Sequence, residues 1–246
     1  MKLVAAILAL LALASTSSPA TADHADGGIV RVAVYRGPAA CEDCPEALAR
    51  AIVRVSPRYR VEFVGPAERA DVTPATLARY RIYVQPGGGQ DIDAALASLG
   101  SARTAAIRAF VARGGGYLGL CMGAYLADAS NLGLVPGDLD SEVRRPGFPV
   151  RTIADAAVRV TWNGKPRTVY YQDGPFLHPR PADRAYRAIA TYQNGDLAAA
   201  RYASGAGTVV LSGPHPEADR SWFEEADLAA APSGQPVKPL LDQFGY

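Results

Sequence analysis

A cysteine flanked by glycines, between a predicted strand and a predicted helix, is the feature that most constrains this chain. Residues 113–127 read Arg-Gly-Gly-Gly-Tyr-Leu-Gly-Leu-Cys-Met-Gly-Ala-Tyr-Leu-Ala. A predicted helix ends at the glycine run, a short apolar strand follows, and another helical run begins after Cys121. Gly119 and Gly123 allow a sharp turn that exposes the cysteine at the carboxyl end of a sheet. The pattern predicts a nucleophile, whose thiolate the positive end of the following helix favours.

Two other interpretations of this stretch bear on function. A cysteine in an apolar strand is often a buried core residue, and the stretch alone leaves that alternative open. Gly114, Gly116 and Gly119 also match the Gly-x-Gly-x-x-Gly pattern of dinucleotide-binding loops. That fingerprint needs a strand before it and a helix after it, whereas here a predicted helix precedes the glycines. We therefore predict no cofactor.

The charge balance argues against nucleic-acid binding. The 246-residue chain has 25 Lys and Arg residues against 24 Asp and Glu residues, and no basic run is interleaved with aromatic residues. A nucleic-acid partner requires a basic surface. Three cysteines and three histidines give no four-ligand metal pattern. We expect a small-molecule or peptide amide as the partner; the sequence identifies no protein partner.

The first 22 residues have the layout of a secretory signal peptide. A positive start at Lys2 precedes a continuous apolar stretch over 4–14, and Ala20-Thr21-Ala22 fits a small-x-small cleavage site. The apolar stretch is too short for a membrane span. We expect a mature chain that begins at Asp23, works in the periplasm or outside the cell, and forms a single domain over 23–246.

A pair of cysteines follows the first predicted strand. Cys41-Glu-Asp-Cys44-Pro45 lies in the loop before a predicted helix, and Pro45 suits the first turn of that helix. This spacing resembles a thioredoxin-type redox motif. In an exported protein a local structural disulfide between Cys41 and Cys44 is the favoured interpretation.

The order of predicted elements indicates an α/β fold. Apolar strands over 29–35, 59–64 and within 77–84 alternate with helical stretches, as in a mainly parallel sheet with helices on both faces. After residue 128 the predicted strands are short and joined by turns, including Asn163-Gly164 and Asn194-Gly195. This part, with strand candidates over 134–143, 156–162, 167–171, 188–192 and 197–202, predicts an antiparallel hairpin extension at an edge or over the mouth of the sheet.

Two further segments complete a candidate site. Gln85-Pro-Gly-Gly-Gly follows the third strand, where free backbone N–H groups face a ligand. With the N–H of Met122, this loop would form an oxyanion hole; a tight connection that needs positive φ is the alternative. His215-Pro216-Glu217 follows the last strong strand and supplies a base together with an acid to orient it.

Together, Pro86-Gly87-Gly88, Gly119-Leu-Cys121-Met-Gly123 and His215-Pro-Glu217 resemble the class I glutamine amidotransferase superfamily. The resemblance spans about residues 29–228 and is strongest to the biotin-protein ligase N-terminal domain family, in its stand-alone exported bacterial form. It implies a flavodoxin-like sheet of the class I amidotransferase type. We expect neither a synthase domain nor a biotin-ligase catalytic module within these residues, so the resemblance does not imply biotin transfer.

The resemblance implies a role for each matching residue. Cys121 would be the nucleophile, His215 the base and Glu217 the orienting acid, with oxyanion donors from Gly88 and Met122. The substrate pocket would be lined by Gly87, Tyr171, Gln172, Asp173 and Gly174. We expect a cysteine-dependent amidohydrolase that cleaves an amide bond through a thioester intermediate. A non-catalytic ligand-binding or regulatory module of the same fold is the alternative.

Overall fold

The computed structural model describes residues 28–234 and 237–246. The predicted signal peptide and its cleavage site lie outside these residues. None of the helices in the described part of the chain is long and apolar enough to cross a membrane.

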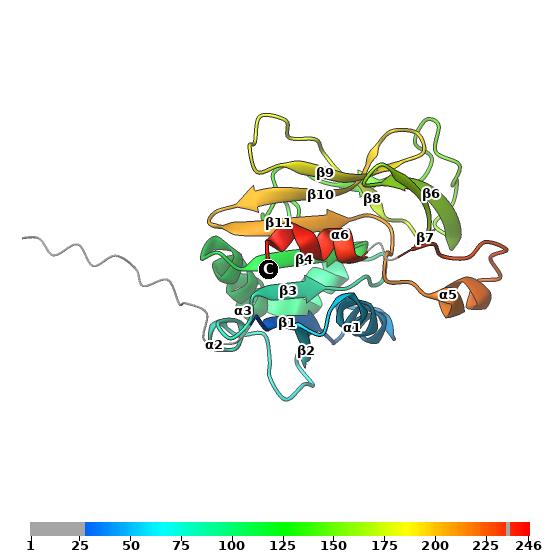
Figure 1. Ribbon diagram of the computed structural model, residues 1–246. Helices are drawn as coiled ribbons and strands as arrows, with labels where there is room; N and C mark the ends of the chain where they lie inside the picture. Colours follow the sequence, from blue (N-terminus) through cyan, green and yellow to red (C-terminus); the bar gives the residue numbers. More distant parts are fainter. Residues whose placement is uncertain (1–27, 235–236) are drawn as a thin grey trace, which may run out of the picture.

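One sheet of nine strands runs through the described residues in the order β2-β1-β3-β4-β11-β10-β9-β6-β7 (Figure 1). The first five of these pair in parallel, and their order matches that of flavodoxin-like folds. Their bounds are β1 Val30–Tyr35, β2 Tyr59–Val64, β3 Ile82–Gln85, β4 Gly116–Leu120 and β11 Gly207–Ser212. The predicted parallel half of the fold is confirmed.

The other strands of this sheet pair antiparallel and continue it at one edge. They are β10 Leu197–Ser204, β9 Arg187–Tyr192, β6 Ala156–Trp162 and β7 Lys165–Tyr171. The β6–β7 hairpin turns at Asn163 and Gly164, whose φ values of 46° and 74° fit a type I′ turn. The predicted antiparallel extension is therefore present, joined edge-on to β11 in the same sheet.

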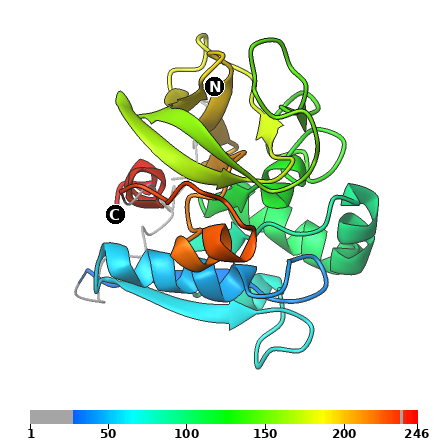
Figure 2. The same ribbon diagram turned by 90° about the vertical axis from the view of Figure 1, so that its right-hand side faces the viewer.

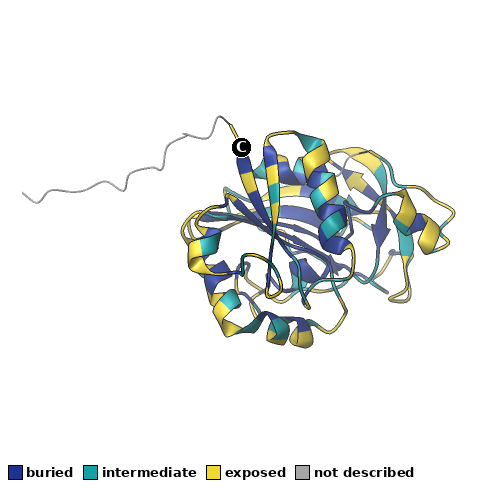
Figure 3. Ribbon diagram, turned by 90° about the horizontal axis from the view of Figure 1, so that it is seen from below, coloured by how far each residue is buried: buried dark blue, intermediate teal, exposed yellow. Residues whose placement is uncertain are grey.

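Helices cover both faces of the sheet (Figures 1 and 2). On one face α1 (Cys44–Val55) and α6 (Val237–Leu241) pack against an apolar cluster that includes Leu48, Ile82 and Leu240. On the other, α2 (Pro74–Leu77) and α3 (Ile92–Ala112) pack against a second apolar cluster that includes Leu77, Tyr83 and Leu99. Figure 3 shows the resulting layers, with buried strands inside and the exposed sides of the helices outside.

The remaining elements are short. They are α4 Met122–Tyr125, α5 Arg220–Glu225, the 3₁₀ helix Asp242–Phe244, and a two-stranded sheet of β5 Asp140–Ser141 with β8 Pro175–Phe176. The long helix α3 is interrupted only at Gly100, which has φ 74° and ψ 160°.

The predicted strand over 134–143 is wrong except for β5. Two features keep this segment out of the sheet. Gly137 has φ 83° and breaks the extended run. The buried Asp128 carboxylate accepts hydrogen bonds from the N–H groups of Asn131 and Leu139, which folds the segment into a loop. Burial raises the pKa of Asp128, and these backbone N–H donors oppose that rise.

The β6–β7 turn yields a test of backbone strain. A Cβ at Gly164 would meet no atom within 4 Å, so the only cost of Gly164→Ala is its positive φ. We expect the substitution to lower the free energy of unfolding by about 1 kcal/mol in chemical denaturation. Gly89→Ala is the matched control, because a Cβ there also meets nothing within 4 Å and its φ lies outside the left-handed range. Equal effects of the two substitutions would contradict the assigned turn.

Candidate active site

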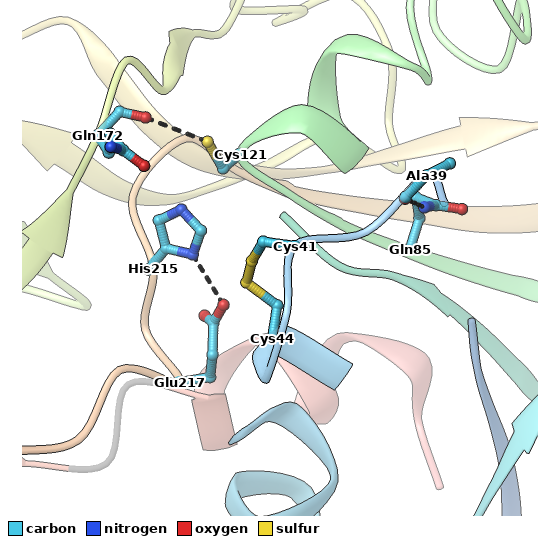
Figure 4. The surroundings of a disulfide bond; sticks show 8 residues. All are labelled: Ala39, Cys41, Cys44, Gln85, Cys121, Gln172, His215 and Glu217. Atoms are coloured by element: carbon cyan, nitrogen blue, oxygen red, sulfur yellow. Dashed lines mark hydrogen bonds and ion pairs between the residues drawn. A yellow bond between two sulfur atoms is a disulfide. The ribbon is translucent and has the colours of Figure 1, made fainter. Parts of the chain in front are cut away.

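Three neighbouring parallel strands end at the same edge of the sheet and deliver the predicted site. The loop with Gly87 and Gly88 follows β3, Cys121 follows β4, and His215 lies three residues after β11. Figure 4 shows the cysteine, the histidine and Glu217 gathered at this edge. Because the order of strands is β3-β4-β11, segments that are far apart in the sequence lie side by side.

Cys121 occupies a strained turn that the neighbouring glycines make possible. Its backbone has φ 50° and ψ −111°, which L-residues rarely adopt, and its N–H donates to Ser212 O at 2.8 Å. A Cβ at Gly119 would collide with the carbonyl of Gly123, and a Cβ at Gly123 would collide with the carbonyl of Gln85. The predicted turn is therefore present. The helix after it, α4, has four residues, so the helix dipole acts over a single turn.

His215 and Glu217 form a buried pair. The imidazole Nδ1 lies 2.8 Å from Glu217 Oε1, and the two residues are 4% and 3% exposed. The N–H of His215 donates to Tyr170 O at 2.9 Å, which ties the loop to β7. The ring of Tyr170 packs edge-on against the imidazole. The position of the His215 ring is thus fixed by the backbone hydrogen bond to Tyr170 and by the contact of Nδ1 with Glu217.

Electrostatics favour the charged form of this histidine. Burial lowers the pKa of His215, but the carboxylate of Glu217 and the sulfur of Cys121 outweigh that effect and raise it to about 10. The Oε2 oxygen of Glu217 is buried and has no hydrogen-bond partner among the described residues. The imidazolium is therefore the main partner of this carboxylate.

The thiol of Cys121 lies next to the imidazole of His215 (Figure 4). Its assigned hydrogen bond runs elsewhere, from Sγ to Gln172 O at 3.3 Å. Cys121 as a whole residue is 6% exposed, and it borders a cavity. The arrangement holds a thiol between a carbonyl acceptor and a base.

The glycine-rich loop after β3 borders both side chains. A Cβ at Gly87 would collide with the imidazole of His215, and one at Gly88 would collide with the side chain of Met122. The N–H of Met122, the first residue of α4, has no intrahelical partner. That of Gly88 donates no hydrogen bond within the described residues. Both predicted oxyanion donors thus lie beside Cys121 with their N–H groups unpaired.

A cavity of about 200 Å³ opens beside Cys121. Two of the five predicted substrate-pocket residues line it, namely Gln172 and Asp173. Sequence reasoning missed the lining side chains of Gln90, Ile92, Tyr125, Asp140 and Ser141. Gln90 lies in a loop, Ile92 begins α3, Tyr125 ends α4, and Asp140 and Ser141 form β5. None of them belongs to a motif, so no sequence signal pointed to them.

The other three predicted pocket residues stand behind the wall of the cavity. Gly87 backs the imidazole, as described above. Tyr171 is fully buried, and its hydroxyl donates to Gly174 O at 2.9 Å. A Cβ at Gly174 would collide with the carbonyl of Gly213. Tyr171 and Gly174 therefore shape the turn that carries Gln172 and Asp173, and neither residue lines the cavity.

The remaining two cysteines form a disulfide next to the site (Figure 4). Their Cα atoms are 5.4 Å apart, a normal separation for this bond. The N–H of Cys41 donates to Gly87 O at 2.9 Å, and the Gln85 amide donates to Ala39 O at 2.6 Å. The disulfide loop is thus attached to the loop that carries Gly88.

Metal ligation finds no support in the described part of the chain, where no group of three His, Cys, Asp or Glu side chains is placed to hold an ion. The other histidine in that part, His178, lies away from the cysteine. Its Nε2 lies 2.8 Å from Asp138 O, and its ring contacts Phe176.

Comparison with known proteins agrees with this architecture. Residues 30–145 match the family described as biotin-protein ligase, N terminal. No curated protein matches the sequence. Among solved structures, PurLQS from Thermotoga maritima superposes with a TM-score of 0.59 at 15% identity, over 88% of this chain and 97% of the matched chain. A structure described as a glutamine amidotransferase superposes with a TM-score of 0.55 at 16% identity, over 87% and 99%.

At these identities the structural likeness concerns the fold. Together with the family match it confirms the resemblance predicted from the glycine loop after the third strand, the turn at Cys121 and the His-Pro-Glu segment. The chain has the class I glutamine amidotransferase-like fold, and over residues 30–145 it matches the biotin-protein ligase N-terminal family.

Proposed function

We propose that this protein is a cysteine-dependent amidohydrolase that cleaves an amide bond through a thioester. The observation that carries the proposal is the position of Cys121, on a strained turn next to the buried His215–Glu217 pair. A strained, partly enclosed cysteine with an adjacent base and an orienting acid is the arrangement that covalent acyl transfer requires.

The proposed reaction uses each part of the site in turn. The thiol proton of Cys121 passes to Nε2 of the neutral His215 imidazole, which gives the thiolate–imidazolium pair that the raised pKa of His215 favours. Sγ then attacks the carbonyl carbon of the amide. The oxyanion accepts hydrogen bonds from the N–H groups of Gly88 and Met122. His215 then gives its proton to the leaving amine as the C–N bond breaks. Water, deprotonated by His215, attacks the thioester, which releases the carboxylic acid and returns the thiol.

Glu217 acts as a positioning residue in this scheme. Its contact at Nδ1 leaves Nε2 of the imidazole as the nitrogen that exchanges a proton with Cys121. It also stabilises the imidazolium that forms when the thiol is deprotonated.

One observation favours the alternative, a ligand-binding module without turnover. The hydrogen bond from the Cys121 thiol to Gln172 O holds the proton on sulfur and competes with its transfer to His215. In that function the same cavity binds a ligand, and the cysteine does no chemistry.

Alkylation of Cys121 separates these two functions. At about pH 6 an unactivated thiol reacts slowly with iodoacetamide. We expect rapid labelling of Cys121 in the wild type, measured by mass spectrometry, and labelling at least about tenfold slower in His215→Ala. His178→Ala, which removes the histidine away from the cysteine, is the control and should keep the wild-type rate. Slow labelling that His215→Ala leaves unchanged would favour the binding module.

Glu217→Gln tests the electrostatic role of the acid. The pKa of His215 is raised above 6.5, so the pair contributes stability that is fully present below about pH 6.5 and lost as pH rises through about 10. We expect Glu217→Gln to lower the midpoint of the His215 imidazole titration, followed by NMR. The difference in unfolding free energy between wild type and variant should shrink between pH 6.5 and 10. A difference that does not vary with pH would assign Glu217 a purely packing role.

We also propose export, with cleavage after Ala22 and a Cys41–Cys44 disulfide in the mature protein. The N-terminal sequence pattern supports the first part and the cysteine geometry the second. Expression of the full chain in a Gram-negative host should yield a periplasmic product that begins at Asp23. Its non-reduced mass should be about 2 Da below that of the reduced form. A full-length cytoplasmic product would contradict export.

A further inference from the structure

We propose that the acyl part of the substrate carries a positive charge, an ammonium or a guanidinium, and no carboxylate near the amide. This inference rests on the proposed function, because it assigns the substrate class of the same site. The cavity beside Cys121 carries it, through the charges and hydrogen-bonding groups of its wall.

The cavity lining contains two kinds of polar group. Next to Cys121, the N–H groups of Gly88 and Met122 are the donors, and they are reserved for the oxyanion in the proposed reaction. The lining also includes two carboxylates, those of Asp140 and Asp173. The lining residues include no Lys or Arg. The fixed side-chain charges that a ligand meets in this lining are therefore negative.

Asp173 is held in place. Its backbone has φ 50°, and its carbonyl accepts a hydrogen bond from the Tyr125 hydroxyl at 3.0 Å. Its Oδ1 accepts one from Ser141 Oγ at 2.5 Å, whereas Oδ2 accepts none within the described residues. Oδ2 of Asp173 is thus available to a ligand. The Tyr125 hydrogen bond fixes the backbone of Asp173 in the absence of a ligand.

The neighbouring groups do not neutralise this wall. Tyr125 remains an uncharged phenol, because burial and the nearby Asp173 and Cys121 raise its pKa. Arg145 lies within electrostatic range of Asp140, but its Nε pairs with Asp196 at 2.6 Å and its guanidinium stacks on Phe176. The guanidinium of Arg145 is therefore held by Asp196 and Phe176, and Arg145 does not line the cavity.

This charge pattern discriminates between amides of similar size. Free glutamine would place a carboxylate in a cavity whose lining offers it no Lys or Arg side chain. An acyl group with an ammonium but no carboxylate places complementary charge against Asp140 and Asp173. In a partly enclosed cavity such complementarity raises the local concentration of cations and disfavours anions.

The first test measures the charge preference at Cys121 without requiring turnover. Alkylation rates are measured with iodoacetate and iodoacetamide, each divided by its rate with 2-mercaptoethanol. The His215 imidazolium itself attracts the anion, so the readout is how the iodoacetate-to-iodoacetamide ratio changes between variants. We expect the ratio to rise about threefold in Asp140→Asn and in Asp173→Asn, and less in 1 M salt.

Asp138→Asn is the matched control for this experiment. Asp138 lies two residues from Asp140, does not line the cavity, and accepts a hydrogen bond from Ser130. The control should leave the ratio near the wild-type value. Unchanged ratios in both Asp140→Asn and Asp173→Asn would overturn the proposal, as would an equal rise in the control.

The second test compares three primary amides by ammonia release. They are 5-aminopentanamide, the neutral hexanamide of the same number of heavy atoms, and glutaramate. We expect kcat/KM to be highest for the cation and lowest for the anion, with the preference reduced in Asp173→Asn. A preference for glutaramate would overturn the proposed substrate class. Ammonia from none of the three, with the alkylation ratios as expected, would instead remove the amidohydrolase function and leave a cation-binding cavity.

Discussion

The site depends on the parallel pairing of β3, β4 and β11. Each strand ends in a segment that supplies one chemical component: a loop with a free N–H, a cysteine and a histidine. The three segments meet only because the strands are neighbours. The backbones of these segments pass so close to one another that an added Cβ atom would collide. Gly123 must be a glycine because the turn after β4 passes against the carbonyl at the end of β3, on Gln85. A change in the pairing of these strands would therefore also displace the residues of the site.

The antiparallel half of the sheet also belongs to the site. Tyr170 on β7 accepts a hydrogen bond from the backbone of His215, and the turn after β7 brings Gln172 to the cysteine. Tyr171, at the end of the same strand, holds that turn through Gly174. The nucleophile and base come from the parallel half, whereas the wall that faces them comes from the extension. A parallel sheet alone would leave the cavity open on that side.

The sequence predicts what depends on local patterns. β-Branched runs define the parallel strands, Asn163-Gly164 defines a hairpin, and the glycines around Cys121 define the turn, because each requirement lies within a few residues. Tyr171 illustrates what such patterns miss. Alternation along β7 sends neighbouring side chains to opposite faces, so Tyr170 packs against His215 whereas Tyr171 points into the core. Asp140 reaches the cavity through a loop shaped by the distant Asp128, and no local pattern records that contact.

The contact between Cys121 and Gln172 links the nucleophile to the turn that forms part of the cavity wall. A thiol that donates to a carbonyl is a resting state, since attack requires its proton to move to His215. The carbonyl acceptor belongs to the turn that also presents Asp173 to the cavity. A cation bound at Asp173 would therefore lie close to the group that restrains the thiol, and its charge would favour the thiolate over the thiol. Recognition of the substrate and activation of the nucleophile would then share one short turn, which explains why so many hydrogen bonds fix its backbone.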